Sequence, residues 1–399
     1  MSMDRNVQIS PATHDGPPKT GPAVSWADVG VGLAILAALA LVAFNVHSNM
    51  AAAGIQPGFS FLGQQAGFDL SESLIPYSAN DSYLRAILAG LANTIAVAAA
   101  SLVIACAIGL LLGLLSVSAA PLARLFALAY VELFRNLPKI LVLLVIFVAA
   151  VNGLPAVRQA LVLGPLTVSN RAIYLPWLAE DPRNAAWLAA SVLLVPALLW
   201  LWMRHVARRQ ARTGGRGLAL PVALAIIVVV PVALAVVLGA PLALSWPQLE
   251  GFSVNGGMAL SIQFCTVALA LGLYHGAQIA EVLRGGIEAV PAEQIEAAEA
   301  LGLKRRQTTR LVVVPQVLRA VVPPLNNQFA NLLKNTSISI AVGYSDLMSV
   351  AGTAINQTFR PLETMLITMT IYLLICVALT GALNHWSARI RAREGRGAR

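Results

Sequence analysis

The residues best suited to chemistry lie in one polar stretch, residues 281–337, late in a very apolar chain. Within it Glu293, Glu296 and Glu299 recur at three-residue steps, which places three carboxylates along one side of a short helix. The basic residues 304–306 follow almost directly. An acidic helix face beside a basic turn can bind a partner by charge, although on these features alone an ordinary solvated loop fits equally well.

Two short helices joined at a glycine are the elements that this stretch predicts. Pro291 suits the first turn of a helix, where its missing N–H would have no partner. Gly302 can adopt a left-handed backbone conformation and end that helix. Thr308 and Thr309 can cap the second helix, and Pro315 should break or kink it. We expect the pair to lie in or near the membrane surface.

The sequence contains no recognisable catalytic or phosphate-binding motif. A Walker A loop ends in Gly-Lys-Ser/Thr, so that backbone N–H groups and a lysine hold the phosphates. None of the four lysines follows a glycine: Lys19, Lys139, Lys304 and Lys334. The five histidines lack HExxH spacing, and no GxSxG elbow is present. We therefore expect no catalytic residue, no metal site and no ATP site in this chain, so that any ATP hydrolysis belongs to a partner.

Other polar residues fall at the edge of apolar runs or inside them, where they are functional candidates by default. One group lies on a segment that enters the membrane: Asn327, Asn331, Lys334, Thr336 and Ser337. The alternative role, hydrogen bonds between helices worth about 0.6 kcal/mol each, is equally open. Two acid–base pairs at three-residue spacing can orient their helices: Glu281 with Arg284, and Glu132 with Arg135.

The composition is that of an integral membrane protein. Of the 399 residues, 58% are apolar and 11% are charged, whereas soluble domains average roughly 25% charged residues. The mean hydropathy is +0.74. The net charge of +9 comes from arginines grouped in blocks, as the positive-inside rule expects, so that nucleic-acid binding is not indicated. Three cysteines lie in apolar runs without disulfide or metal spacing: Cys106, Cys265 and Cys376.

Apolar runs predict an all-α protein with eight membrane spans. They are residues 29–46, 85–115, 140–151, 187–203, 218–238, 258–273, 320–350 and 362–383. The first run, residues 29–46, is longer than the apolar core of a signal peptide, which has about 7–15 residues. We therefore expect it to remain in the protein as an uncleaved helix. Residues 47–83 carry no Lys or Arg and mark the outer side, whereas arginines at 204–216 and 389–399 mark the cytoplasmic side. Both termini are then cytoplasmic.

The polar stretch resembles the EAA loop of ABC-importer permeases. The match comprises Glu296-Ala297-Ala298, then Gly302, then residues 312–315, in which valines replace both aliphatic residues of the family's Ile-x-Leu-Pro. The flanking residues 280–287, 315–319, 323–325 and 333–337 are closest to the polar amino-acid permease family. One departure is Glu293, where that family often has glycine.

Two earlier segments extend the resemblance. Gly90, Asn93 and Thr94 resemble the GxxNT start of the family's membrane domain. Residues 130–138 resemble its YVE-x-x-RGTP segment, although Asn136-Leu137 replaces Gly-Thr and leaves the role of that glycine in doubt. Residues from about 152 to 249 look like an insertion of the kind found in the general L-amino-acid permeases.

The resemblance implies a type I ABC-importer transmembrane domain whose EAA helices dock into a groove of a separate ATPase. Carried over residue by residue, it assigns ATPase coupling to Glu296, Ala297, Ala298, Gly302 and Pro315. It assigns the permease core and the translocation pathway to Asn93, Thr94 and the polar group at 327–337.

The implied function is that of a permease subunit for L-amino acids, polar or broad in range, in a bacterial inner membrane. The expected partners are two copies of an ABC ATPase that bind ATP and Mg, a related permease or a second copy of this chain, a periplasmic amino-acid-binding protein and the lipid bilayer. The alternative is an ion-coupled secondary carrier, which needs an acidic or His relay at the bilayer midplane. The acids here fall mainly at loops and helix ends, and no internal repeat is visible.

The sequence divides into six segments on this reading. They are a disordered tail (1–24), an extra helix and periplasmic loop (25–84), the first core part (85–151), the insertion (152–249), the second core part with the EAA loop at 281–319 (250–388), and a basic tail (389–399).

Overall fold

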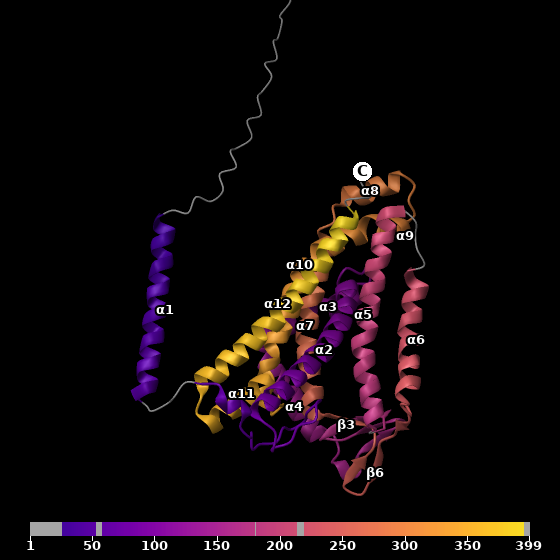
Figure 1. Ribbon diagram of the computed structural model, residues 1–399. Helices are drawn as coiled ribbons and strands as arrows, with labels where there is room; N and C mark the ends of the chain where they lie inside the picture. The colour runs from indigo at the N-terminus through magenta and orange to yellow at the C-terminus, as the bar shows by residue number, and fades with distance from the viewer. Residues whose placement is uncertain (1–25, 53–57, 180, 214–218, 395–399) are drawn as a thin grey trace, which may run out of the picture. The chain divides into compact units, whose positions relative to one another are not determined.

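The computed structural model describes residues 26–52, 58–179, 181–213 and 219–394, in two units. The first unit contains α1 (Trp26–Ala52), and the second begins at Ser60 and holds all the other elements (Figure 1). The expected tail at 1–24, the glycine-rich turn at 214–217 and the last residues 395–399 lie outside the described residues.

Helices make up most of the second unit. The longer ones are α2 (Tyr83–Ser116), α5 (Pro182–Thr213), α6 (Ala219–Leu238), α7 (Ile262–Glu288), α10 (Val314–Asn335) and α12 (Pro361–Glu394). The shorter ones are α3 (Pro121–Asn136), α4 (Lys139–Gly153), α8 (Ala292–Ala300), α9 (Arg305–Thr308) and α11 (Leu347–Thr358). Single turns complete the set: η1 (Ser60–Gly63), η2 (Val157–Gln159), the π-helical η3 (Thr309–Val313) and η4 (Thr336–Val342).

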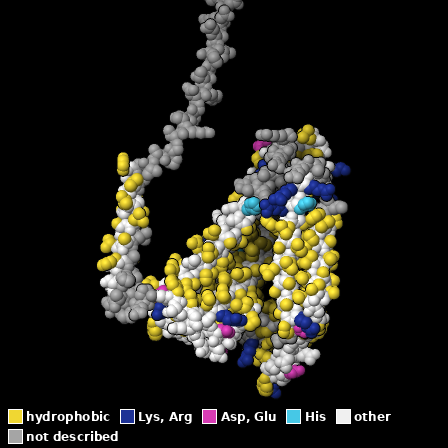
Figure 2. Space-filling model, viewed as in Figure 1, with side chains coloured by type: hydrophobic (Ala, Val, Ile, Leu, Met, Phe, Trp, Pro, Cys, Tyr) yellow, Lys and Arg dark blue, Asp and Glu magenta, His cyan; other side chains and the backbone are white. Residues whose placement is uncertain are grey.

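Among the described residues, five helices are long and apolar enough to cross a membrane, or seven segments if each of two bent pairs counts as one span. Helix α1 adds a shorter apolar run over 29–42. Hydrophobic side chains cover the flanks of these helices (Figure 2), as a lipid environment requires. The count of eight spans stays a prediction.

Two of the spans are bent. Helices α3 and α4 meet at 104°. The break falls at Leu137-Pro138, because a proline ring disfavours the helical conformation of the residue before it, and Leu137 is extended. The predicted span at 320–350 begins earlier, at Val314, and is also interrupted: η4 ends at Gly343, whose φ is 75°, and α11 continues at an angle of 55°.

Helices α2 and α7 pack closely against each other, through glycines on both. A Cβ built on Gly109 of α2 would lie 2.4 Å from Cγ2 of Ile279, and one on Gly272 of α7 would lie 2.5 Å from Cγ2 of Ile104. Each glycine therefore receives a β-branched side chain of the other helix. Gly109 and Gly113 are spaced four apart, which gives α2 a flat face, and this face is used for contact between helices.

Short strands gather at the end of the unit opposite α8, which we call the sheet end (Figure 1). They are β1 (Leu161–Leu163), β2 (Leu166–Val168), β3 (Ala172–Leu175), β4 (Trp177–Leu178), β5 (Leu244–Ser245), β6 (Gln248–Glu250), β7 (Ser253–Asn255) and β8 (Met258–Ser261). Four form an antiparallel sheet in the order β1-β2-β3-β8, and the rest form the ribbons β4-β5 and β6-β7.

The prediction that a span begins at Met258 is wrong. Met258 pairs with Leu175, and Ser261 pairs with Ala172, so these residues form a strand. Helix α7 begins at Ile262 because the Ser261 side chain accepts a hydrogen bond from the Phe264 N–H at 2.9 Å. The strand partner lies far away in the sequence, in the insertion, so a local apolar pattern could not reveal it.

Candidate coupling and translocation sites

Helix α8 and the turn after it form the first candidate site. Helix α8 ends in a Schellman motif: the Gly302 N–H donates to the Glu299 carbonyl at 2.8 Å, and the Leu303 N–H donates to the Ala298 carbonyl at 3.2 Å. Gly302 takes the left-handed φ of 77° that the sequence predicted for it. Helix α9 then folds back against α8 and continues through η3 into α10.

The outer face of this helical hairpin is exposed. Glu296 and Ala297 are exposed on α8, whereas Ala298 is only 4% exposed and faces the hairpin interior. Leu301, at the tip, is 82% exposed although it is apolar. Sequence reasoning did not select Leu301; the signal was a leucine directly before the capping glycine. An acidic face around an exposed leucine is typical of a surface that a partner covers.

Pro315 lies in the first turn of α10, where a missing N–H costs little. The preceding η3 is a π-helical turn, so the chain passes through the proline with a local distortion and without a break. The side chain of the next residue, Gln316, donates a hydrogen bond to the Gln294 side chain of α8. The hairpin is therefore attached directly to the start of a long helix.

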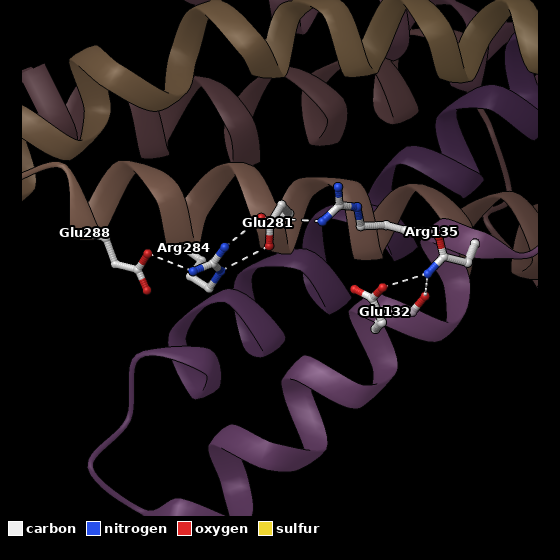
Figure 3. A network of polar contacts seen from close by, with 6 residues as sticks. Glu132, Arg135, Glu281, Arg284 and Glu288 are labelled. Carbon is white, nitrogen blue, oxygen red and sulfur yellow. Dashed lines mark hydrogen bonds and ion pairs between the residues drawn. The ribbon is translucent and has the colours of Figure 1, made fainter.

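A network of charged groups links α3 to α7 beneath the hairpin (Figure 3). Arg284 contacts Glu281 at 2.7 Å, the pair that the spacing predicted, and also Glu288 at 2.7 Å. Arg135 of α3 reaches Glu281 at 3.5 Å, so Glu281 lies between two arginines. The Arg284 guanidinium fork and a shared carboxylate hold the ends of two helices together.

The Glu132 side chain does not form the predicted pair with Arg135. It accepts a hydrogen bond from the Asn136 amide at 2.8 Å, one turn later on α3 (Figure 3). Asn136 is the residue that stands where the resembled family has glycine. Arg135 instead contacts Glu281 of α7. The spacing of residues within one helix could not predict this contact between two helices.

The second candidate site is a hollow between α10 and α12. It has a volume of about 600 Å³. Its walls carry three of the predicted polar residues, Asn327, Asn331 and Lys334, and on α12 they include Thr380 and Gly381. The three residues on α10 share one face of that helix, so they give the hollow a polar wall.

The remaining predicted polar residues lie outside the hollow and form hydrogen bonds within the protein. Thr336 is fully buried and its hydroxyl donates to the Leu333 carbonyl at 2.8 Å. Thr94 is fully buried and its hydroxyl accepts from the Leu347 N–H at 2.9 Å. Ser337 is half-buried and donates to the Lys334 carbonyl at 3.0 Å. The structure therefore does not bring the seven residues together in one site.

Asn93 has a specific structural task. Its amide nitrogen donates to the Glu72 and Ser345 carbonyls, each at 2.8 Å, and its amide oxygen accepts from the Leu74 N–H at 3.2 Å. The side chain is 0% exposed. Its amide group therefore makes three hydrogen bonds, which join the loop before α2 to the segment before α11.

Glu72 in the same loop is a site residue that sequence reasoning missed. Its carboxylate accepts from the Ser261 N–H at 3.3 Å, which joins the loop to the start of α7. Burial raises the pKa of Glu72, because the loss of water around the carboxyl group disfavours its charged form. The hydrogen bonds from Ser261 act in the opposite direction and lower the pKa.

Lys139 is a second missed residue. It is the first residue of α4, at the 104° bend, and its ammonium donates to the Asn335 side chain at the end of α10. A lysine directly before the apolar run 140–151 was the available signal. As for metals, the described residues contain no group of three or more His, Cys, Asp or Glu side chains that could hold an ion.

Comparisons with known proteins identify relatives along most of the chain. It is 37% identical over 367 residues to the putative amino-acid ABC transporter permease protein YhdX of Escherichia coli (strain K12), covering 91% of this chain and 93% of that one. It is 37% identical over 354 residues to the general L-amino acid transport system permease protein AapQ of Rhizobium johnstonii, covering 88% of each.

A third relative is the glutamate/glutamine/aspartate/asparagine transport system permease protein BztB of Rhodobacter capsulatus, 34% identical over 393 residues, with 91% of this chain and 92% of that one covered. None of the three names describes an ion-coupled carrier. Among solved structures, one described as an amino acid ABC transporter with histidines matches with a TM-score of 0.46 and 20% identity, over 77% of this chain and 95% of that one.

A family model covers the core of the chain. The model described as binding-protein-dependent transport system inner membrane component matches residues 105–392, from the middle of α2 almost to the end of α12. This range includes the hairpin, the charged network and the hollow. The chain therefore belongs to the family of inner membrane components of binding-protein-dependent transport systems.

Proposed function

We propose that this chain is a permease subunit of an ATP-driven importer of L-amino acids, polar or broad in range, with the type I importer architecture. The names of YhdX, AapQ and BztB support the substrate class. The fold family supports a partner ATPase and a substrate-binding protein. The translocation unit would contain a related permease or a second copy of this chain, and the ATPase dimer would bind ATP and Mg.

The observation that carries the proposal is the exposed hairpin at the end of the spans. Glu296 and Leu301 lie on its outer side, and Gly302 sets its bend. The partner ATPase would cover this face, with Leu301 as an apolar anchor and the glutamates around it. Closure of the ATPases on ATP would then move α8, and with it α10 through the contact between Gln294 and Gln316.

The direction of the hairpin follows from charge. Lys and Arg side chains gather near the α8 end (Figure 2). The arginines at the end of α5, Arg204 and Arg208, are exposed, and Figure 1 draws that end of α5 beside the α8 end. Helix α12 also finishes there (Figure 1). By the positive-inside rule, this end and both termini of the chain are cytoplasmic in our proposal, in a bacterial inner membrane.

The pathway would run along the polar face of α10, between this chain and the second permease. Asn327, Asn331 and Lys334 supply its polar groups. Thr336 and Asn93 would hold its walls in place from the interior. The charged network of Arg135, Glu281 and Arg284 would keep α3 and α7 moving together.

Reconstitution tests the function as a whole. The chain is purified with its copurifying permease, ATPase and binding protein and placed in liposomes. We expect ATP-dependent accumulation of at least one tracer from a panel of L-glutamate, L-glutamine, L-arginine and L-alanine. Uptake by this chain alone, driven by an ion gradient without ATP, would contradict the proposal.

Two hairpin variants test the coupling role. We expect Glu296→Lys and Gly302→Asp to reduce uptake at least about tenfold, the equivalent of roughly 1.4 kcal/mol of lost interaction with the ATPase. The matched control is Glu250→Lys, an exposed acid at the sheet end. Assembly, measured by copurification of the ATPase, and uptake are recorded separately. Normal assembly together with normal uptake in both hairpin variants would refute the role.

A further inference from the structure

Lys139 carries a positive charge in the middle of a span. It begins α4, after the bend that separates α3 from α4. Helix α4 packs on α7 and η4, so the ammonium is half-buried among helices. Among the described residues its partner is the neutral side-chain oxygen of Asn335, and none of the ion pairs there includes it.

The acids on the surrounding elements are engaged elsewhere. On α7, Glu281 and Glu288 face Arg284. Glu132 of α3 accepts from Asn136, and Asp346 caps α11 by accepting from the Ser349 N–H. A half-buried cation among membrane-spanning helices with no acid beside it is costly, because no counter-ion offsets its charge.

The groups next to Lys139 offer it no negative charge. Its partner Asn335 offers its amide nitrogen to Nε2 of His275 at 3.2 Å. His275 is 2% exposed, near the middle of α7, and its Nδ1 has no hydrogen-bond partner among the described residues. The first N–H groups of α4 also point out of that helix at its positive end. Helices α4 and α10 thus place a cation and a neutral amide side by side, and no carboxylate of the described residues completes the group.

We propose that Lys139, with Asn335 and the start of α4, forms a carboxylate-binding site on the translocation pathway. Lys139 is the residue that recognises the charge, and Asn335 positions its ammonium. The inference rests on the proposed function: it adds the chemical group of the amino acid that the pathway recognises. Asn335 follows Lys334, which lines the hollow, at the end of α10.

A ligand carboxylate would replace the Asn335 oxygen as the main partner of the ammonium. A charged pair is stronger than the present contact to a neutral amide. Since every free L-amino acid carries an α-carboxylate, one lysine would serve a broad range of substrates. Side-chain selection would then fall to other residues or to the binding protein.

The test uses the assembled permease–ATPase complex in nanodiscs, without ATP or binding protein. The probe is the tracer that the wild type accumulates fastest from the panel above, compared with its α-carboxamide. We expect the wild type to bind the free acid at least about tenfold more tightly than the amide. Lys139→Gln should lose this preference, and Lys139→Arg should keep it. The matched control, Arg124→Gln, removes an exposed cation at the start of the same bent span and should also keep it.

The outcomes separate the site from the function. A wild type that accumulates none of the four amino acids overturns the proposed function itself. A wild type that transports, with the same acid-over-amide preference in Lys139→Gln, overturns only the carboxylate site. Loss of the second permease from the purified Lys139→Gln complex would also overturn it, because Lys139 would then pair with an acid of that subunit. Asn335→Ala that folds and binds should weaken the preference less than Lys139→Gln.

Discussion

Single side chains show how differently similar residues are used in this protein. Asn93 and Asn327 are both polar residues within apolar helices, and by pattern alone they are equivalent candidates for the pathway. In the structure Asn93 is enclosed and bonded to a loop and to the segment before α11, whereas Asn327 faces the hollow beside α12. The difference arises from which side of the helix meets a neighbour, so sequence could name the residues but could not sort them.

The same loop contains a titratable group whose effect on stability can be worked out. The folded pKa of Glu72 lies above the ordinary value of 4.5 because burial disfavours the carboxylate. The contribution of Glu72 to the free energy of unfolding is therefore fully present below about pH 4.5. It is lost as the pH rises through the raised pKa of the folded state. Glu72→Gln, which keeps an acceptor for Ser261 but cannot ionise, should be more thermostable than the wild type at about pH 8 and should converge with it at about pH 4, below the unfolded pKa.

Thermal unfolding of the purified complex in detergent at the two pH values measures this. Asp69→Asn, which removes an exposed carboxylate from the same loop, is the matched control variant. A Glu72→Gln variant that is less stable than the wild type at the higher pH would show that the charge of Glu72 is needed there.

At the scale of elements, the contact between α2 and α7 organises the bundle. Gly272 and Gly276 of α7 accept Ile104 and Ile108 of α2, and Gly109 of α2 accepts Ile279 in return. Such close approach lets two apolar helices gain dispersion contacts that lipid would otherwise supply. The spacing of glycines indicated a flat face, but the partner helix became evident only in three dimensions.

This contact predicts opposite effects for two glycines on one helix. Gly272→Ala places a Cβ 2.5 Å from Cγ2 and 2.7 Å from Cβ of Ile104, so a helix must shift. We expect a loss of about 1–3 kcal/mol, typical of overpacking. At Gly285 a new Cβ meets nothing within 4 Å, and Gly285→Ala should stabilise the helix by about 0.5–1 kcal/mol. Denaturant unfolding monitored by tryptophan fluorescence compares them; equal losses at both sites would contradict the packing argument.

For the whole molecule, the helical part of the insertion stands out within the second unit because it makes few contacts with the other helices. Helices α5 and α6 pack mainly against each other, with the Trp187 indole N–H donating to the Pro231 carbonyl at 2.7 Å. Their membrane-crossing stretches are almost entirely unburied. The ribbon β4-β5 closes this helical hairpin at the sheet end, where the Ala179 N–H donates to the Ala243 carbonyl at 2.8 Å.

The hairpin of α5 and α6 should therefore be removable. We expect replacement of residues 182–238 by a short Gly/Ser linker to leave a chain that still inserts, retains the α2–α7 contact and copurifies with the ATPase. The two ends to be joined already lie side by side, as the bond between Ala179 and Ala243 shows. Copurification and thermal unfolding provide the readout, and a variant that is degraded or no longer assembles would mean that the helical hairpin supports the core.

The sequence by itself determined the features that depend on neighbouring residues. Apolar runs define most of the spans, because each must match the bilayer alone. Gly302 defines the bend of the α8 hairpin, because a left-handed cap is a local property of glycine. The EAA pattern indicated the family that the comparisons then showed.

Only the tertiary structure decided the features that depend on residues distant in the chain. Met258–Ser261 became a strand because β3 lies beside it. Arg135 turned to Glu281 of α7 although Glu132 lies on its own helix. Lys139 met Asn335 and stands apart from the acids described around it. In each case several local arrangements have similar energy, and contacts between helices select one of them.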